Sequence, residues 1–172
     1  MFFKNIILSK MKTTNDILLL GNPLLNEISE AITIQEFTKI NEWVADLHSA
    51  MKDIRAKYSF GRGIAAPQLG IMKRMIYLNI DKPIVIINPE IIEKSVEMIT
   101  LWDDCMSFPN LLVKVKRHKN IRLSYLNEYR EQKEWYVEND LSELIQHEYD
   151  QLDGILAIQR AIDSKSFRWR LL

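Results

Sequence analysis

A histidine, two carboxylates and a glutamine lie within five residues near the end of the chain. The segment QHEYDQ, from Gln146 to Gln151, matches the His-Glu-x-x-His pattern of metal-binding helices except at the second histidine. In a helix, His147 and Gln151 would share a face, because positions four apart differ by about 40° around the axis. Glu148 would lie about 100° away, where it can flank a metal. Alone the segment is a weak signal, since a hydrogen-bonded core histidine beside a solvated glutamate gives the same pattern.

The only cysteine, Cys105, stands in the segment WDDCMSFPN, between two aspartates and a Ser-Phe-Pro break. A single free cysteine is commonly a small buried hydrophobe. Its polar neighbours favour a second interpretation, in which a divalent metal stabilises the thiolate as a soft ligand.

A third segment, GRGIAAPQLG, holds three of the five glycines of the chain. Gly61 and Gly63 permit backbone conformations that side chains forbid, or the close approach of a ligand. The segment is not a phosphate loop, because no lysine with a following serine or threonine stands at the required spacing. Taken alone, it could also be a tight helix-to-strand connection.

Hydrophobic periodicity predicts the elements that hold these segments. Residues 33–58 carry apolar side chains at helical spacing, and Thr33 with Glu36 forms a capping-box pattern. The last helix is expected to have Asp140 as its cap and to end at Gly154. Strands are expected between these helices, in residues 74–80, 83–92, 93–102, 111–127 (with a turn near its end) and 131–139. A long helix near the N-terminus, several strands and a final helix predict an α+β fold.

Length and composition predict a single domain over residues 1–172, with 47% hydrophobic and 27% charged residues. The 23 basic and 23 acidic residues balance, which argues against a nucleic-acid partner. No apolar run approaches the roughly 20 residues that span a bilayer, so no membrane partner is expected. A single cysteine suits a reducing compartment, which predicts a cytoplasmic location with an organelle as the alternative. Residues 1–12 are interpreted as a flexible tail rather than a targeting segment.

In order, the three segments resemble the motifs of the peptide deformylase family: Gly-x-Gly-hydrophobic-Ala-Ala-x-Gln, Glu-Gly-Cys-Leu-Ser and His-Glu-x-Asp-His. The chain reads GRGIAAPQ, DDCMS and HEYDQ. The resemblance runs from Ile17 to Ile162 and also includes ILLLGNPLL, IINPEIIEKS and QLDGILAI. It implies a deformylase-like fold, in which antiparallel and mixed strands pack around a C-terminal metal-site helix.

The resemblance implies a metal-dependent hydrolase that removes the N-formyl group from the N-terminal methionine of newly made polypeptides. Cys105, His147 and Gln151 stand at the three ligand positions for one divalent metal ion. Iron(II) is the metal that the family usually binds, with zinc or nickel as alternatives. Glu148 stands at the position of the general base. The implied partner is an N-formylmethionyl peptide or a nascent chain at the ribosome, and the oligomeric state is left open.

The same resemblance assigns residues around the substrate. Gln68 and the backbone N–H of Met106 would stabilise the oxyanion that forms at the formyl carbon. Gly63 would help to hold the peptide in an extended form. Arg62 would border the peptide groove, and Asp103 stands where the family motif has a glutamate.

Five departures from the family pattern leave alternatives open. Gln151 replaces a histidine and is the poorer donor to a borderline metal. Asp104 replaces a glycine, and Arg62 replaces an apolar residue. Asp103 replaces a glutamate, and Leu112 falls where many members place a substrate-facing arginine. The chain is therefore also compatible with a catalytically weakened or inactive relative that binds N-terminal peptides, or with a metal hydrolase for another acyl group.

Overall fold

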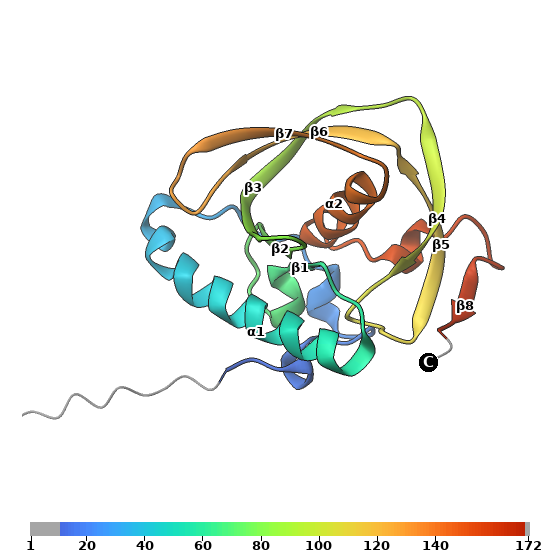
Figure 1. Ribbon diagram of the computed structural model, residues 1–172. Helices are drawn as coiled ribbons and strands as arrows, with labels where there is room; N and C mark the ends of the chain where they lie inside the picture. Colours follow the sequence, from blue (N-terminus) through green and yellow to red (C-terminus); the bar gives the residue numbers. More distant parts are fainter. Residues whose placement is uncertain (1–10, 171–172) are drawn as a thin grey trace, which may run out of the picture.

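The computed structural model describes residues 11–170, so most of the expected tail, residues 1–10, lies outside the described residues. Two antiparallel sheets curve around one helix (Figure 1). The first sheet has the strand order β1-β2-β3-β6-β7, and the second has the order β4-β5-β8. The strands are β1 (Gly63–Ala65), β2 (Met75–Asn79), β3 (Pro83–Lys94), β4 (Met98–Asp104), β5 (Leu111–His118), β6 (Asn120–Leu126), β7 (Gln132–Glu138) and β8 (Phe167–Trp169). The α+β prediction is confirmed.

Two α-helices, α1 (Ile40–Tyr58) and α2 (Asn139–Leu152), cover opposite faces of the first sheet. Because side chains alternate along a strand, Met75 and Tyr77 of β2 pack toward α1, whereas Ile76 and Leu78 pack toward α2. The second sheet lies on the other side of α2, so this helix is enclosed between the two sheets (Figure 1). Neither α1 nor α2, nor any shorter helix within residues 11–170, has the length and apolar character to cross a membrane.

The helix near the N-terminus begins in two stages. The N–H and Oγ1 of Thr33 donate to Glu36 Oε2 at 2.9 and 3.0 Å, as the capping-box pattern predicts. This cap opens the 3-10 helix Ile34–Lys39, and the α-helix starts only at Ile40. Of the expected tail, Lys12 contacts α1, because its carbonyl oxygen accepts a hydrogen bond of 2.7 Å from Ser49.

The predicted strand over residues 93–102 is wrong, because a turn divides that range. β3 continues to Lys94 and β4 begins at Met98. Ser95 stabilises the turn: its N–H donates to Asn120 O at 2.9 Å and its Oγ donates to Glu97 O at 2.8 Å. The turn moves the chain from the first sheet to the second, and β4 carries Asp103 and Asp104 to the side of α2 that faces away from the first sheet.

The predicted start of the last helix is also wrong. The cap residue is Glu138, whose side chain makes no capping hydrogen bond, and Asp140 lies in the first turn. The Asp140 carboxylate binds Arg62 instead, with one N–O distance of 3.2 Å. A carboxylate in the first turn is still favourable, because it faces the positive end of the helix dipole. The predicted end is confirmed, since Gly154 has a φ of 71° and donates to Gln151 O at 3.2 Å.

Glu36 should make stability depend on pH. Hydrogen bonds from Lys73, at 2.8 Å, and from Thr33 lower the pKa of Glu36 from 4.5 to about 2. Because the pKa is lower in the folded state, these bonds stabilise the protein fully above about pH 4.5, and the stabilisation is lost as the pH falls toward 2. Glu36→Gln should therefore lower the free energy of unfolding at about pH 7 and lower it less at about pH 3, as measured by urea unfolding.

The control for this experiment is Glu27→Gln, which changes an exposed glutamate that forms no side-chain hydrogen bond within residues 11–170. A difference between Glu36→Gln and wild type that stays constant across this pH range would contradict the prediction.

Candidate active site

The three motif segments meet at helix α2. His147, Glu148 and Gln151 of this helix are buried, with 4%, 2% and 2% of their surfaces exposed. Cys105 follows β4 directly, and Gln68 lies in the 3-10 helix Ala66–Leu69 after β1, each with 1% exposed. The two sheets enclose α2, so the end of β4 and the turn after β1 both reach it. Residues from three separate segments thus form one buried site.

The side-chain amide of Gln151 lies between Cys105 and His147. Its Nε2 donates to Cys105 Sγ at 3.6 Å and lies 2.7 Å from His147 Nε2, to which it can donate when the imidazole is neutral. Its Oε1 is buried and has no partner among residues 11–170. A half-turn of the amide would exchange these two atoms and direct the oxygen toward the sulfur and the imidazole. A thiolate, an imidazole nitrogen and an amide oxygen are donors that a borderline divalent metal accepts, so these residues fit a metal ion.

Asp103 orients His147. The Nδ1 of His147 donates to the Asp103 carboxylate, at 2.8 and 2.9 Å from its two oxygens, so that in the neutral imidazole the Nε2 lone pair is directed at Gln151. Arg117 of β5 donates to Asp103 at 3.4 Å and also binds Asp150 of α2. Burial opposes the imidazolium, yet the Asp103 carboxylate raises the pKa of His147 well above its ordinary value. Asp103 therefore acts through His147, and its role as a substrate contact stays a prediction.

Glu148 points toward strand β1. A Cβ added to Gly63 would lie 2.9 Å from Glu148 Oε1 and 2.8 Å from Leu78 Cδ2, so the glycine leaves room for the carboxylate. The other oxygen of Glu148, Oε2, is buried without a hydrogen-bond partner in the part of the chain that the structure describes. Burial raises the pKa of Glu148 to about 7, so this group can exchange a proton near neutral pH.

Two hydrogen-bond donors lie beside Cys105. Gln68 Nε2 lies 3.7 Å from Cys105 Sγ and donates to Ser107 Oγ at 3.2 Å, while its Oε1 accepts from Ala65 N–H at 3.0 Å. Both ends of the amide are therefore held in place. The backbone N–H of Met106 has no acceptor within the described residues. A fixed amide and a free N–H are suited to stabilising an oxyanion.

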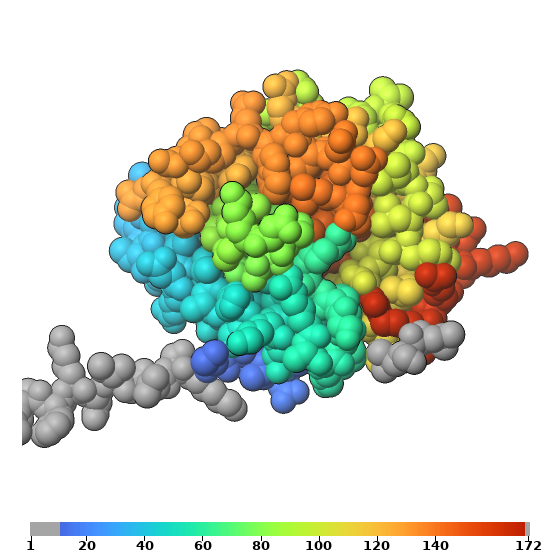
Figure 2. Space-filling view, in the orientation of Figure 1, coloured from blue at the N-terminus to red at the C-terminus, as the bar shows by residue number. Residues whose placement is uncertain are grey.

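A cavity of about 300 Å³ opens beside His147 and Glu148. Two of its lining residues form ion pairs: Arg62 pairs with Asp140, and Asp104 pairs with Arg170. The surface view shows the teal loop after α1 close to the orange segment that leads into α2 (Figure 2). The remaining lining comes from Ser59, Phe60, Gly61, Gly63, Asp103, Met106, Glu143 and Leu144.

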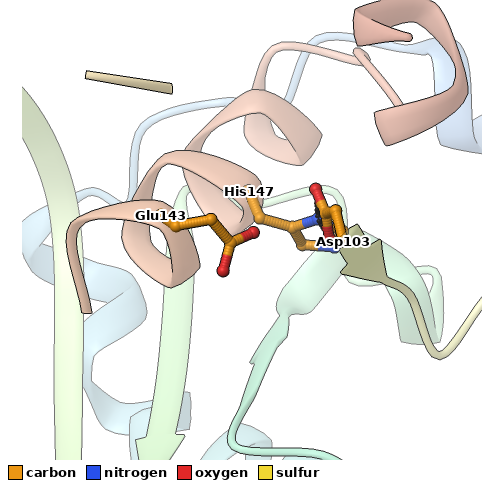
Figure 3. A group of neighbouring side chains, drawn as sticks. All are labelled: Asp103, Glu143 and His147. Atoms are coloured by element: carbon orange, nitrogen blue, oxygen red, sulfur yellow. Dashed lines mark hydrogen bonds and ion pairs between the residues drawn. The ribbon is translucent and has the colours of Figure 1, made fainter. Parts of the chain in front are cut away.

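Asp103, Glu143 and His147 form a second group that could hold a metal, since their ligand atoms lie within 4.8 Å of one another. Figure 3 shows Glu143 and His147 projecting from α2, with His147 directed at Asp103 on the neighbouring strand. His147 belongs to this group and also to the group of Cys105, His147 and Gln151. The chain therefore has a buried site with metal-ligating side chains.

Sequence reasoning missed two of these residues, and each had a signal. Strand alternation places Arg117 on the same side of β5 as Val113 and Val115, which are fully buried. A buried arginine was therefore predictable from LLVKVKRH. Glu143 lies four residues before His147, and Gln151 lies four residues after it. The three residues therefore share one face of α2.

Comparisons with known proteins identify the family. Residues 14–167 match the family model described as polypeptide deformylase. The chain is 36% identical over 152 residues to a peptide deformylase of Pseudothermotoga lettingae. The alignment covers 88% of this chain and 85% of that protein. It is 33% identical over 146 residues to the peptide deformylase of Thermotoga maritima, with coverage of 84% and 85%. The chain belongs to the polypeptide deformylase family.

Solved structures agree with this assignment. A crystal structure of a peptide deformylase from Synechococcus elongatus in complex with actinonin matches with a TM-score of 0.82 and 25% identity, covering 92% of this chain and 84% of that one. The crystal structure of peptide deformylase from Thermotoga maritima matches with a TM-score of 0.78 and 29% identity. The match covers 90% of this chain and 99% of that one.

Asp103→Asn should weaken metal retention about 10- to 100-fold, because the substitution removes the carboxylate that orients His147. The measurement is competition with a chelating dye on protein that circular dichroism shows to be folded. Asp104→Asn is the matched control: the neighbouring aspartate pairs with Arg170 instead, so metal retention should stay unchanged. Equal retention in both variants would show that Asp103 does not position the ligand.

Proposed function

We propose that this protein is a metal-dependent hydrolase that removes the N-formyl group from the N-terminal methionine of newly made polypeptides. One observation carries the proposal. In a chain of the polypeptide deformylase family, Cys105, His147 and Gln151 meet in a buried site beside the unpartnered carboxylate oxygen of Glu148. The site combines metal-ligating atoms with a proton acceptor, and a metal-assisted amide hydrolase needs both.

Cys105 Sγ, His147 Nε2 and the amide oxygen of Gln151 would hold the metal. When bound, the ion would supply a Lewis acid that polarises the formyl carbonyl and makes water more acidic. Iron(II) is the ion that the family resemblance implies, and the donor set also suits zinc or nickel.

The other residues act on protons and on developing charge. Glu148 would accept a proton from the attacking water and return it to the amine released from the formyl group. Gln68 Nε2 and the backbone N–H of Met106 would donate to the formyl oxygen as negative charge develops on it. These donors lie in a buried site, where each is more effective than at the surface.

The substrate would bind along β1. This strand is at the edge of its sheet, so an extended peptide can pair with its backbone near Gly63, and Arg62 borders the same region. The crystal structure of the Synechococcus elongatus deformylase contains actinonin, which supports ligand binding by this fold. We place the reaction in the cytoplasm, on formylmethionyl peptides or nascent chains at the ribosome. We also propose one domain over residues 1–172, of which residues 1–12 are the tail.

Gln151→His should increase metal retention and formyl-peptide hydrolysis together. Imidazole is the stronger donor to a borderline metal, and the i, i+4 spacing places it on the same face as His147. Each tenfold gain in rate corresponds to roughly 1.4 kcal/mol of transition-state stabilisation. The experiment measures metal stoichiometry and turnover of formyl-methionyl peptides under anaerobic conditions, with Gln151→Ala as a control that removes the amide and adds no ligand. Wild type that is already fully metallated and as fast as the variant would show that the amide suffices.

Glu148→Gln should lower kcat by about 10²- to 10⁴-fold while metal stoichiometry stays at the wild-type value. The substitution keeps the size of the side chain and removes the group that exchanges the proton. Single-turnover hydrolysis and metal analysis on the same preparation provide the measurement. Retention of full activity would remove Glu148 from the mechanism, and loss of metal together with activity would assign it a structural role.

A further inference from the structure

The segment between β4 and β5, residues 105–110, carries two of the groups that are proposed to act in hydrolysis. They are the thiol of Cys105 and the backbone N–H of Met106. A loop lacks the repeated hydrogen bonds of a helix or strand, so other contacts must hold it in place. Its middle is held at Ser107, whose Oγ accepts a hydrogen bond of 3.2 Å from Gln68 Nε2. The two ends of the segment need separate support.

Arg170 supplies that support from the C-terminal end of the described chain. It follows β8, which pairs with β5. Its backbone N–H donates to Asn110 O at 2.7 Å, and its Nε donates to Pro109 O at 3.1 Å. Its Nη2 donates to the carboxylate of Asp104, the residue directly before Cys105. One arginine therefore connects the start of the segment with its last two residues.

The guanidinium of Arg170 also contacts a second loop. Its Cζ lies 4.3 Å from the centroid of the Phe60 ring, which is a cation–π contact. Phe60 and Asp104 both line the cavity at the candidate active site. A Cβ added to Gly61 would lie 2.8 Å from Met106 Cε, so this loop packs directly against Met106. Arg170 thus joins the loop after α1 to both ends of the segment that carries Met106.

The contacts of Arg170 restrict geometry more than they add stability. The side chains of Arg170 and Asp104 are 20% and 41% exposed, and ion pairs at such positions usually contribute little to the free energy of unfolding. The planar guanidinium nevertheless fixes the directions of its bonds to Pro109 O and to the carboxylate. The bonds to Pro109 O and Asn110 O do not depend on the charge of Asp104, so Asp104→Asn should leave them in place.

We propose that Arg170 is a positioning residue for the candidate active site, which holds segment 105–110 so that Cys105 and the N–H of Met106 stay beside α2. The C-terminal strand then belongs to the functional unit. Donors that are already in place need no rearrangement as charge develops on the substrate, so their position affects kcat more than KM. The effect on hydrolysis rests on the proposed function, whereas the restraint on the segment does not.

The test measures amide hydrogen exchange by NMR on the full-length protein supplied with zinc. Two amides report on the segment: Phe108 N–H donates to Cys105 O at 3.1 Å, and Leu111 N–H donates to Phe108 O at 3.0 Å. In Arg170→Ala both should exchange about tenfold faster, because the segment opens locally more often. The amides of α2 and the midpoint of urea unfolding should stay at their wild-type values, since they report global stability.

Arg168→Ala is the matched control on the same strand. Arg168 lies over Trp102 of β4, with its Cζ 4.2 Å from the centroid of the ring, and its side chain forms no hydrogen bond within residues 11–170. This variant should leave the exchange of Phe108 and Leu111 unchanged. Steady-state kinetics on formyl-methionyl peptides provide the second measurement. Arg170→Ala should lower kcat by up to about 100-fold with little change in KM, and Arg168→Ala should change neither.

Equal exchange in Arg170→Ala and Arg168→Ala overturns the inference. So does faster exchange that the amides of α2 share together with a lower urea midpoint, because Arg170 would then act on global stability. Should Arg170→Ala not fold, Arg170→Lys decides: lysine keeps the charge but has no Nε–H for Pro109, so unchanged exchange rejects the inference.

The two measurements also separate this inference from the proposed function. If wild type hydrolyses no formyl peptide, the proposed function fails, and hydrogen exchange still decides whether Arg170 holds the segment. If wild type is active and Arg170→Ala exchanges faster at unchanged kcat, deformylation stands and the positioning role of Arg170 is rejected.

Discussion

The enclosure of α2 between two sheets is the constraint on which the rest of the structure depends. A helix surrounded by protein must satisfy its polar side chains internally. Ser142 and Gln146 do so by donating to His118 O at 2.9 and 2.8 Å, and Asp150 does so by binding Arg160 at 2.8 Å. These contacts attach the helix to the second sheet and to the chain that follows it. Polar groups that remain without a partner on α2 then mark the places where chemistry can occur.

The unpartnered groups lie together. Oε2 of Glu148 and Oε1 of Gln151 are buried without a partner, and the carboxyl group of Glu143 forms no hydrogen bond or ion pair within residues 11–170. Each of these residues lines the cavity or contacts Cys105. Such groups make the folded state less stable than an apolar helix would. Burial also supplies what a hydrolase needs, because it raises the pKa of Glu148 and places the donor atoms in a protein environment, where charges interact more strongly than at the surface. The same enclosure therefore explains both the unfavourable energy and the reactivity.

Arg117 connects this site to the second sheet. It binds Asp103, which orients His147, and it also binds Asp150, one turn further along the same helix. A buried ion network of this kind is weak evidence for stability, because desolvation offsets most of the attraction. Its clearer effect is geometric: it fixes the position of the end of β4 relative to α2, and so the distance between Cys105 and His147.

Periodicity could predict the helices and most strands, because it records which face of an element is buried. It could not predict what buries that face. Asp140 is of a residue type that commonly caps helices. Its carboxylate instead forms an ion pair with Arg62, which is far away in the sequence. The strand predicted over 93–102 is divided because the chain passes from the first sheet to the second at Ser95. This change of sheet depends on tertiary packing, which periodicity does not record. Motif spacing could predict that three segments carry chemistry, whereas the cavity that Glu143 lines exists only after both sheets have formed.

The unusual residues of the site differ in how well the fold accommodates them. Arg62 and Asp104 each have an ion-pair partner near the surface, and Gln151 lies within hydrogen-bond distance of both Cys105 and His147. An amide can present either a donor or an acceptor to these two atoms, so glutamine satisfies a buried sulfur and imidazole in a way that an apolar residue could not. As the proposed ligand it would bind a metal less tightly than imidazole would, and it leaves neither the sulfur nor the imidazole without a hydrogen-bonding neighbour. Glu143 has no hydrogen-bond or ion-pair partner within residues 11–170, and burying its carboxyl group without one makes the folded state less stable.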